Sequence, residues 1–393
     1  MDLKEAKLQA EKYLMQTYSP YPVLFTEGKG SYLYDDTHKS YLDFFSGIAV
    51  NNLGYSHPGV IEAITSQINK LMHVSNLYYT EPALEAAKAL VEASKLDKVF
   101  FCNSGTEANE GALKLARLYG SNKGKRRIVS ALNSFHGRSM GGLSLTGQTK
   151  YHQGFEPLIP EIAYTKYNDL EALDHDLTPD TAALILEPVQ GESGVHPATS
   201  EYLQKARELC NERDILLIFD EVQTGIGRSG EFLAYQALGV KPDIITVAKG
   251  LGGGLPIGAV LAKEKVAVFT PGKHASTFGG NPVAAKAAAT VVKEIANEKF
   301  LIAVQEKAAY LSQLLAKPHP LIKEVRGLGL MIGVELNIKA NEVVKVALEN
   351  GLVIGTAGES VVRLLPPLTI TKEEIEKGIK LFYAALDWCM EGR

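Results

Sequence analysis

A chain of 393 residues is too long for one ordinary hydrophobic core and indicates a large domain with a smaller one. With 46% hydrophobic residues and a net charge of −4, it has a globular composition and lacks the basic surplus of nucleic-acid-binding proteins. Its three cysteines, Cys102, Cys210 and Cys389, have neither disulfide nor metal-ligand spacing, which indicates buried thiols in a reducing compartment and no metal site. Residues 1–18 are charged and no apolar stretch reaches the length of a membrane span, so we expect a cytoplasmic protein without membrane or nucleic-acid partners.

The first elements expected in chain order form a β-hairpin. Residues 20–50 contain the segment KGSYLYDDTHKSYLDFFSG, in which two stretches suited to strands flank Asp35 and Asp36. Aspartate favours tight turns because its carboxylate accepts hydrogen bonds from nearby backbone N–H groups. We therefore predict a hairpin with these two residues at its turn.

Short apolar runs then alternate with helical patterns through the middle of the chain. The helical period of 3.6 residues is present at 107–120 and 200–214. The apolar runs are typical of strands buried on both faces, and they lie at 98–103, 127–131, 182–189, 215–220 and 244–248. This alternation predicts an α/β domain with a mostly parallel central sheet, which we place at residues 55–295.

The C-terminal part of the chain has a different pattern. After residue 300 we expect a helix, a strand at 325–336, a second helix, a strand at 361–365 and a terminal helix from Lys372. This order predicts a smaller α+β domain at 296–393, and we expect the N-terminal segment, 1–54, to join it.

The segment NSGTEANE, residues 103–110, follows an expected strand and opens an expected helix. Ser104 and Glu107 have the spacing of a capping box, so the simplest interpretation is a well-capped helix. A second interpretation is an anion site, because Gly105 allows close backbone approach and the free N–H groups of a helix N-terminus attract negative charge. The carboxylate of Glu107 makes such a site less positive, and both interpretations stay open.

Asp220 and Glu221 stand at the end of an apolar strand, in ILLIFDEVQTGIGRSG (215–230), where ligands of α/β sheets gather. An acid of the Walker B type would need a phosphate loop, and the form G-x-x-x-x-G-K-[ST] does not occur. Gly225, Gly227 and Gly230 match a dinucleotide fingerprint, so an NAD-dependent oxidoreductase is an alternative, although two carboxylates precede these glycines. A third interpretation is a carboxylate paired with a protonated ring nitrogen.

Lys249 favours the third interpretation. It ends the next apolar strand, in IITVAKGLGGGLPIGA (244–259), and Gly250 follows at once. The alternative is that Lys249 has no role in catalysis and simply ends its strand on the solvent side. However, two successive strands place Asp220 and Lys249 at the same sheet edge, where a bound pyridine ring would need an acid and an amine. Such an amine attacks an aldehyde only when neutral, and burial or nearby cations lower its pKa.

These segments together resemble the class III (ω-amino acid) aminotransferases, which depend on pyridoxal phosphate. The resemblance is carried by FDEVQTGIGRSG and PDIITVAKGLGGGLPIGA and covers the chain from about residue 20. Further motifs follow in the family's order, namely SGTEAN, FHGR (135–138), LEPVQGESGV (186–195), STFGGNP (276–282) and RGLGLMIGVEL (326–336). The resemblance implies the fold-type I architecture of pyridoxal-phosphate enzymes.

The resemblance assigns roles around the cofactor ring. Lys249 matches the lysine that holds pyridoxal phosphate as a Schiff base and then moves the proton, and Asp220 matches the acid at the pyridine nitrogen. Val222 and Phe135 match the residues on the two faces of the ring. Gln223 matches the residue that reaches the phenolic oxygen.

The resemblance also implies a homodimer with a shared active site. Gly105 and Thr106 match the phosphate-binding turn. Thr277 matches a threonine that contacts the phosphate of the neighbouring subunit, and Ser276 beside it is expected to contact substrate. A threonine in an ordinary loop is the alternative that the residues alone leave open.

Two arginines imply small substrates with two carboxylates. Arg138 resembles the arginine that binds the substrate α-carboxylate, and Arg363 resembles the one for the distal carboxylate of glutamate and 2-oxoglutarate. Glu192 resembles a switch residue that pairs with Arg363 while the amino donor occupies the site.

Within the family, GIAVNNLGYSHP (47–58) and LLPPLTIT (364–371) are most similar to the members that act on N-acetylornithine. Gly47, followed by Ile48, stands where relatives that use free ornithine carry a tyrosine two residues before the AVN run, which leaves room for an acylated amine. A turn glycine is the alternative interpretation of Gly47. The resemblance implies transfer of the δ-amino group of N-acetylornithine to 2-oxoglutarate, with N-succinyldiaminopimelate as a further donor. Ornithine, succinylornithine or 4-aminobutyrate aminotransferases are the alternatives within the family, and a non-catalytic regulator is one outside it.

Overall fold

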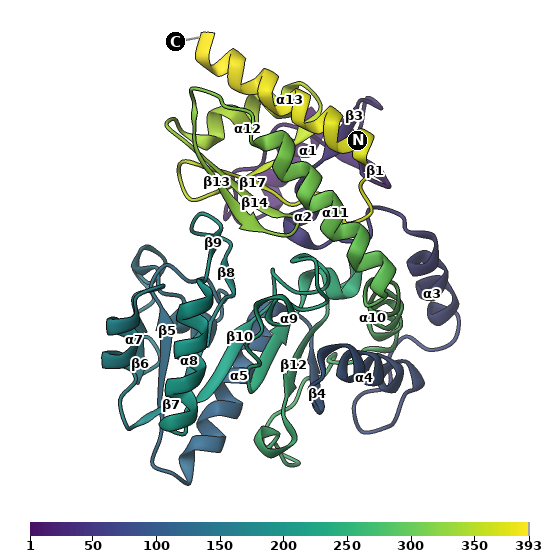
Figure 1. The fold of residues 1–393 in the computed structure, drawn as a ribbon. Helices are drawn as coiled ribbons and strands as arrows, with labels where there is room; N and C mark the ends of the chain where they lie inside the picture. Colours follow the sequence, from purple (N-terminus) through teal and green to yellow (C-terminus); the bar gives the residue numbers. More distant parts are fainter. Residues whose placement is uncertain (392–393) are drawn as a thin grey trace.

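The computed structural model of the protein describes residues 1–391 and contains a central seven-stranded sheet (Figure 1). Its strand order is β4-β12-β11-β10-β7-β5-β6, and only β12 runs antiparallel to its neighbours. The strands are β4 (Lys98–Cys102), β5 (Arg127–Ala131), β6 (Ile162–Thr165), β7 (Thr181–Leu186), β10 (Leu216–Asp220), β11 (Ile244–Val247) and β12 (Gly258–Ala262). The predicted mostly parallel sheet is therefore confirmed.

Helices cover both faces of this sheet because its strands are apolar on both sides. In β10, Leu217 and Phe219 pack in a cluster with α8 (Ser200–Glu212), whereas Leu216 and Ile218 pack in a cluster with α5 (Gly105–Ser121). Successive side chains of a strand point to opposite faces, so the two helices lie on opposite sides. The remaining helices of this part are α3 (Pro58–Ile68), α4 (Glu81–Ser94), α6 (Met140–Leu145), α7 (Leu170–Asp176), α9 (Ala234–Leu238) and α10 (Pro282–Ile295), with short 3-10 turns η1 (Thr149–Tyr151), η2 (Lys249–Gly252) and η3 (Glu264–Val266).

The two ends of the chain meet in a second, smaller part. One sheet joins β1 (Phe25–Lys29), β2 (Tyr32–Asp35), β3 (Ser40–Asp43) and β15 (Leu352–Val353), and another joins β13 (Ile322–Leu328), β14 (Met331–Leu336), β17 (Val361–Leu364) and β16 (Gly355–Ala357). Its helices are α1 (Leu3–Tyr13), α2 (Ser46–Ala49), α11 (Glu298–Leu315), α12 (Ala340–Glu349) and α13 (Lys372–Glu391). Because β3 pairs with β15, the N-terminal strands belong with the C-terminal ones. The exact domain boundaries stay a prediction.

Several expected elements need correction. The single strand expected at 325–336 is a hairpin of β13 and β14, which turns at Gly329 with φ 61°. The strand expected at 182–189 ends at Leu186, and β8 (Val189–Gln190) is a separate short strand paired with β9 (His196–Pro197). Strands β6 and β12 were not expected. The N-terminal hairpin is present, and Asp35 Oδ1 accepts the N–H groups of Thr37 and Lys39 at its turn.

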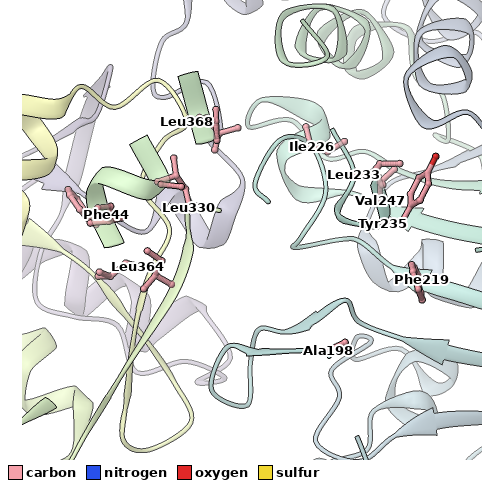
Figure 2. Close-up of a cluster of buried hydrophobic side chains, with 14 of the residues drawn as sticks. Phe44, Ala198, Phe219, Ile226, Leu233, Tyr235, Val247, Leu330, Leu364 and Leu368 are labelled. Atoms are coloured by element: carbon pink, nitrogen blue, oxygen red, sulfur yellow. The ribbon is translucent and has the colours of Figure 1, made fainter. Parts of the chain in front are cut away.

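One hydrophobic core runs across the two parts. Figure 2 shows Phe44, Leu330, Leu364 and Leu368 of the smaller part in the same buried cluster as Phe219, Ile226 and Leu233 of the larger one. The three cysteines are also buried, as expected. Among residues 1–391, no helix combines the length and apolar character needed to cross a bilayer. The continuous core fixes how the smaller part sits over the carboxyl ends of β7, β10 and β11.

Candidate active site

Asp220 and Lys249 line one cavity of about 480 Å³. Asp220 is the last residue of β10, and Lys249 begins η2, directly beyond β11. These strands are parallel neighbours, so their carboxyl ends open at the same edge of the sheet. Glu187 follows β7 at that edge and lines the same cavity. The acid and the amine therefore share a cavity large enough for a small cofactor.

The backbone at Lys249 is strained, and its amine has a shifted pKa. Lys249 has φ 43°, a left-handed conformation that side chains disfavour and that is frequent at functional sites. At Gly250 a Cβ would lie 2.4 Å from Asn52 Nδ2, so no larger residue fits there. Burial lowers the pKa of the Lys249 amine, the negative charge of Glu192 opposes this shift, and the positive charge of Arg363 adds to it. The neutral, nucleophilic amine is thereby favoured.

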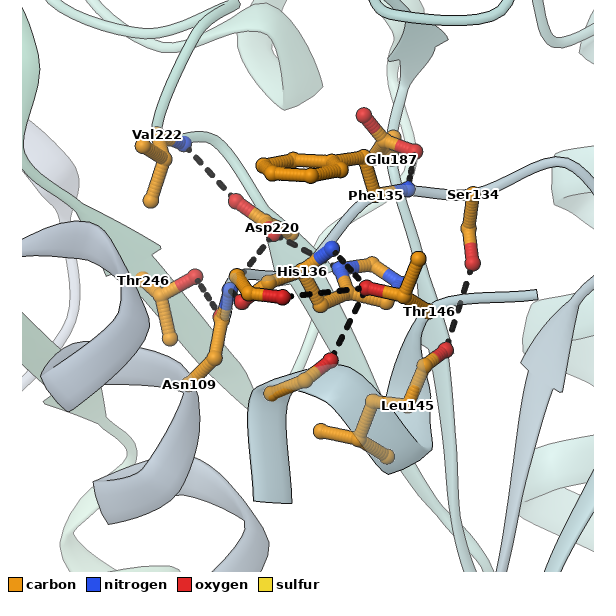
Figure 3. A network of polar contacts seen from close by, with 12 residues as sticks. Asn109, Ser134, Phe135, His136, Leu145, Thr146, Glu187, Asp220, Val222 and Thr246 are labelled. Atoms are coloured by element: carbon orange, nitrogen blue, oxygen red, sulfur yellow. Dashed lines mark hydrogen bonds and ion pairs between the residues drawn. The ribbon is translucent and has the colours of Figure 1, made fainter. Parts of the chain in front are cut away.

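Asp220 is held by a set of hydrogen-bond donors (Figure 3). His136 Nδ1 lies 2.7 Å and Asn109 Nδ2 lies 2.8 Å from Asp220 Oδ2, and the N–H of Val222 donates to Oδ1 at 3.0 Å. Burial by itself would raise the pKa of Asp220, but the hydrogen bond and the charge interaction with His136, together with the hydrogen bonds from Val222 and Asn109, hold that pKa below its ordinary value. The carboxylate thus stays ionised although it is buried.

The neighbouring carboxylate, Glu221, has a structural role instead. Its oxygens accept the N–H groups of Ala234 and Tyr235 at 2.5 and 2.9 Å, at the first turn of α9. Burial raises the pKa of Glu221 to about 7. Consecutive residues at the end of a strand point to opposite sides, which explains why only Asp220 faces the cavity.

The walls of the cavity fit a flat ring that carries an anionic group. Phe135 and Val222 both line it, as do Gly105 and Thr106 at the start of α5. A Cβ at Gly105 would lie 2.7 Å from Val222 Cγ1, so glycine is needed where the helix N-terminus meets the ring wall. Free N–H groups at such a helix end bind phosphate. The four predicted residues therefore line one cavity.

The predicted capping box at this helix is only partly present. The N-cap Ser104 accepts the N–H of Glu107 at 3.3 Å, as expected. Glu107, however, accepts the backbone N–H of Asn103 at 2.6 Å and its side-chain amide at 2.8 Å, instead of the N–H of Ser104. The carboxylate is thereby directed away from the first turn, which weakens the objection that it would repel an anion.

A charged pair lies at the cavity, which Glu192 lines and Arg363 does not. Arg363 Nη1 is 2.6 Å from Glu192 Oε1, and the same nitrogen donates to Gln223 Oε1 at 3.0 Å. Gln223 Nε2 also donates to Glu192 Oε1. Arg138 lines the cavity as well, with its guanidinium 4.0 Å from the centre of the Tyr151 ring. Guanidinium groups at two places suit a substrate with two carboxylates.

Ser276 and Thr277 do not line this cavity. They line an adjoining hollow that shares Asn103 with it, and Asn103 Nδ2 donates to Ser276 Oγ at 3.2 Å. Within a single chain the structure thus separates these two residues from the other predicted site residues.

Three residues at the site have no role in the sequence-based prediction: His136, Asn109 and Glu187. All three are buried, and each makes a hydrogen bond to Asp220 or to the backbone of Phe135. They lie inside the motifs FHGR, SGTEAN and LEPVQGE. Their position inside these motifs could have indicated from the sequence that they belong to the site.

The glycine run at 225–230 forms no dinucleotide site. A Cβ at Gly227 would lie 2.6 Å from Ile295 Cγ2 and 2.8 Å from Leu368 Cδ1, so the segment is packed between the two parts of the molecule. The next helix, α9, begins only at Ala234, and Glu221 occupies its N-terminal N–H groups. The oxidoreductase alternative is therefore wrong.

Comparison with known proteins defines the class. The sequence model of the family described as "Aminotransferase class-III" matches residues 13–386, and the chain belongs to this family. The acetylornithine aminotransferase of Caldanaerobacter subterraneus subsp. tengcongensis is 50% identical over 94% of this chain and 96% of its own length. The acetylornithine aminotransferase of Aquifex aeolicus is 52% identical over 94% of this chain and 98% of its own.

Solved structures agree with this class. The ornithine aminotransferase from Toxoplasma gondii superposes with a TM-score of 0.94 at 32% identity and covers 100% of this chain and 97% of its own. The N-acetylornithine aminotransferase from Stenotrophomonas maltophilia has a TM-score of 0.85 at 36% identity, over 98% of this chain and 100% of its own. The chain is thus an aminotransferase that acts on small molecules. The alternative of a non-catalytic regulator is therefore wrong.

Proposed function

We propose that the chain binds pyridoxal phosphate and transfers the δ-amino group of N-acetylornithine to 2-oxoglutarate, which gives N-acetylglutamate 5-semialdehyde and glutamate. The observation that carries the proposal is the one cavity lined by Lys249, Asp220 and Glu192, with Arg363 paired to Glu192. The acetylornithine aminotransferases that are 50% and 52% identical support the choice of donor.

The residues present fit pyridoxal phosphate. When bound, the cofactor supplies an electron sink for the carbanion next to the reacting nitrogen. The Lys249 amine would hold the cofactor and carry the proton at Nζ, and the Asp220 carboxylate would keep the ring nitrogen protonated. Phe135 and Val222 would cover the faces of the ring, and the N–H groups at Gly105 and Thr106 would bind the phosphate.

The two arginines divide the carboxylates between them. Arg363 is paired with Glu192, and both charges act on the pKa of Lys249, so we place Arg363 at the reacting centre. We therefore assign the α-carboxylate of 2-oxoglutarate, next to the reacting carbon, to Arg363 and its distal carboxylate to Arg138. This reverses the assignment expected for Arg363 from the sequence. Arg138 keeps the α-carboxylate of N-acetylornithine, which lies far from the δ-amine.

Glu192 acts as the switch in this proposal. Its carboxylate neutralises Arg363 while the donor, which has no carboxylate beside its δ-carbon, occupies the site. For 2-oxoglutarate, Glu192 must leave Arg363 so that the substrate carboxylate takes its place. Gln223, bonded to both side chains, would guide this exchange, and its predicted contact with the phenolic oxygen is part of the same proposal.

Gly47 is the residue on which the predicted room for an acylated donor depends. Ser46, Gly47, Ile48 and Ala49 all have left-handed φ values, 50°, 60°, 68° and 59°. Three of these residues are not glycine, so backbone conformation alone does not require glycine at position 47. A side chain there would approach Asn51, since a Cβ would lie 3.3 Å from its Nδ2. A larger residue at position 47 would therefore have to displace the Asn51 side chain.

We include a homodimer with a shared active site in the proposal. Thr277 lines the adjoining hollow and not the cavity of its own chain. Its loop contacts a segment with exposed apolar side chains: Leu77, Tyr78 and Tyr79 are 86%, 67% and 95% exposed. Burial of such a patch favours association. Light scattering would measure the mass, and in a dimer Thr277→Ala should lower the affinity for pyridoxal phosphate. The cytoplasmic location stays a prediction.

The absorption spectrum of the purified protein tests the function. We expect a yellow protein whose visible band is lost on addition of N-acetylornithine and returns with 2-oxoglutarate. Free ornithine and 4-aminobutyrate at equal concentration serve as controls for the donor. A faster loss of colour with free ornithine would make this chain an ornithine aminotransferase, and a colourless protein that does not bind pyridoxal phosphate would refute the whole proposal.

A further inference from the structure

The turn that carries Glu192 lies against the sheet of the smaller part. It joins β8 to β9 and contains Gly191 and Gly194. Arg326 of β13 donates to the carbonyl oxygen of Gly194 twice, from Nε at 3.0 Å and from Nη2 at 2.8 Å. Arg363 of β17 donates from Nη1 to the carbonyl oxygen of Gly191 at 3.1 Å. Two arginines of the smaller part therefore hold the backbone on either side of Glu192.

Arg326 and Arg363 occupy one row of this sheet. Gly333 of β14 is the pairing partner of Arg326 on β13 and of Arg363 on β17. Side chains at directly opposite positions of antiparallel strands point to the same face, so both arginines leave one face of the sheet, with their Cα atoms about 10 Å apart. A Cβ at Gly333 would lie 2.8 Å from Val195 Cβ and 3.1 Å from the carbonyl oxygen of Gly194. Glycine is therefore needed where the turn crosses this row.

The backbone of the turn is strained. Val195 has φ 55°, which a β-branched side chain strongly disfavours, and Gly194 has φ 136°. Val195 is fully buried, in one cluster with Met331 of β14 and Val361 beside it on β17. Strain of this kind persists only where the surroundings enforce it, and it is frequent in segments that switch. The contacts with the smaller part therefore fix the conformation of the turn.

Arg326, the first residue of the motif RGLGLMIGVEL, is itself fixed by two carboxylates. Its Nη1 lies 2.6 Å from Glu335 Oε2 and 2.7 Å from Glu324 Oε2, and its side chain is 10% exposed. The hydrogen bond from Arg326 lowers the pKa of Glu335, so this carboxylate stays ionised at neutral pH. Because Nη1 serves the carboxylates, Nε and Nη2 face Gly194 as a rigid pair of donors, which a lysine cannot provide.

We propose that Arg326 is a positioning residue for Glu192 and confines its exchange at Arg363 to a rotation of the side chain. With the carbonyl oxygen of Gly194 held, the Glu192 carboxylate can leave Arg363 and return to the same place while the turn stays still. Arg326 does not line the cavity, so it acts on substrates only through this turn. The inference rests on the proposed function, in which N-acetylornithine needs Glu192 on Arg363, whereas glutamate and 2-oxoglutarate need it removed.

The preference between two amino donors tests this role. N-acetylornithine and glutamate react with the same form of the protein but need Glu192 in different positions, so a general loss of activity cancels in the ratio of their kcat/KM values. We expect Arg326→Met to lower the ratio of N-acetylornithine to glutamate by about tenfold, because the freed turn no longer returns Glu192 to Arg363. Arg326→Lys should recover part of this ratio, because it keeps the charge and one hydrogen bond.

Arg213→Met is the matched control. Arg213 also donates to backbone carbonyl oxygens, those of Asp174 and Leu177, and pairs with the Asp174 carboxylate, but it ties the end of α8 to α7 and does not line the cavity. Its loss should leave the ratio within about twofold of the wild-type value. Equal effects of Arg326→Met and Arg213→Met on the ratio would overturn the proposal.

A double variant tests whether Arg326 acts through the carboxylate of Glu192. Arg326→Met combined with Glu192→Gln should have the same donor ratio as Glu192→Gln alone, because the residue that Arg326 positions is then no longer charged. A further tenfold fall of the ratio in the double variant would overturn the proposal.

Structure and hydrogen exchange test the fixed turn without turnover. The probe is glutarate, a dicarboxylate without an oxo group, bound to the holoenzyme. We expect a crystal structure in which Glu192 has left Arg363, Arg326 keeps both bonds to Gly194, and the Cα atoms of the turn have moved by less than about 1 Å. The backbone amides of residues 190–196 should exchange faster in Arg326→Met than in the wild-type protein. A turn that moves as a whole with glutarate, or exchange that Arg326→Met leaves unchanged, would overturn the proposal.

If Arg326→Met does not fold, Arg326→Lys decides by the same ratio and the same exchange measurement, since one ammonium group cannot replace two fixed N–H donors. A preference for another amine would change the proposed donor and leave the hydrogen-exchange result as it is. Glu192 that stays on Arg363 with glutarate bound there would contradict the proposed switch itself. Failure of the proposed function is thus distinguishable from failure of the role of Arg326.

Discussion

The two sides of the cavity hold their charges in different ways. On one side Asp220 is surrounded by fixed donors, which lie on α5, on the segment after β5 and on the turn after β10. On the other side Arg363 is paired with Glu192, which lies on a loop between two short strands. Asp220 is 4% exposed, whereas the side chain of Glu192 is 27% exposed.

In the proposed function, this difference corresponds to two tasks. A charge that is needed in both half-reactions is best held by rigid hydrogen-bond donors, because these donors need not reorganise when the reaction begins. A charge that must be released for one substrate and restored for another needs a partner that can move, and partial exposure allows that movement. In the proposed function, Asp220 would be a permanent electrostatic site and Arg363 an exchangeable one, and Lys249 interacts with the charges of both.

The largest effect is expected at Lys249, where the two sides meet. Lys249→Ala removes the amine that, in the proposed function, holds the cofactor and carries the proton, so turnover should fall by at least about 10⁴-fold, as for the loss of a central catalytic group. Steady-state kinetics with N-acetylornithine would measure this loss, with circular dichroism as the control for folding. Turnover near the wild-type rate would remove Lys249 from the mechanism.

A smaller loss is expected when the permanent charge is removed. Asp220→Asn keeps the shape of the side chain but loses the charge at the ring nitrogen, and kcat should fall by about 10² to 10³-fold. Glu221→Gln is the matched control, because that carboxylate caps α9 and faces away from the cavity. If both variants lost the same activity, the distinction between the two neighbouring carboxylates would be wrong.

The exchangeable side should show a loss that depends on the substrate. Arg363→Lys cannot form two parallel hydrogen bonds to a carboxylate, so kcat/KM for 2-oxoglutarate should fall by about tenfold to a hundredfold. The half-reaction with N-acetylornithine should change much less, because Arg363 is paired with Glu192 at that stage. Single-turnover measurements of each half-reaction would separate these effects, and equal losses in both would contradict the switch.

The smallest effect is expected from pH. Burial alone would raise the pKa of Glu192, but the positive charges of Arg363 and Lys249 lower it to about 2. Because this pKa lies below the ordinary value, the pair contributes stability above about pH 4.5 and loses it only as the pH falls towards 2. The KM for 2-oxoglutarate should therefore vary by less than about twofold between about pH 6 and pH 9. A steep change in the wild-type protein that disappears in Glu192→Gln would show that the pair titrates.

Local patterns were enough to predict much of the fold. The apolar strands, the helices at 107–120 and 200–214 and the edge shared by Asp220 and Lys249 follow from periodicity and from the parallel order of strands. Strand β12 escaped prediction because its short apolar run has no distinct signal of its own. The turn at Gly329 was missed because the apolar residues continue on both sides of it.

The sequence by itself determined that an acid and an amine, Asp220 and Lys249, lie at one edge of the sheet. Two successive parallel strands bring them there, however the helices pack on the sheet. Only the tertiary structure decided what controls that chemistry. His136 and Asn109 are 84 and 111 residues away from Asp220 in the chain, and Arg363 is 171 residues away from Glu192. Hydrogen bonds across such separations depend on how the helices, the loops and the smaller part pack around the sheet, and no local pattern contains that information.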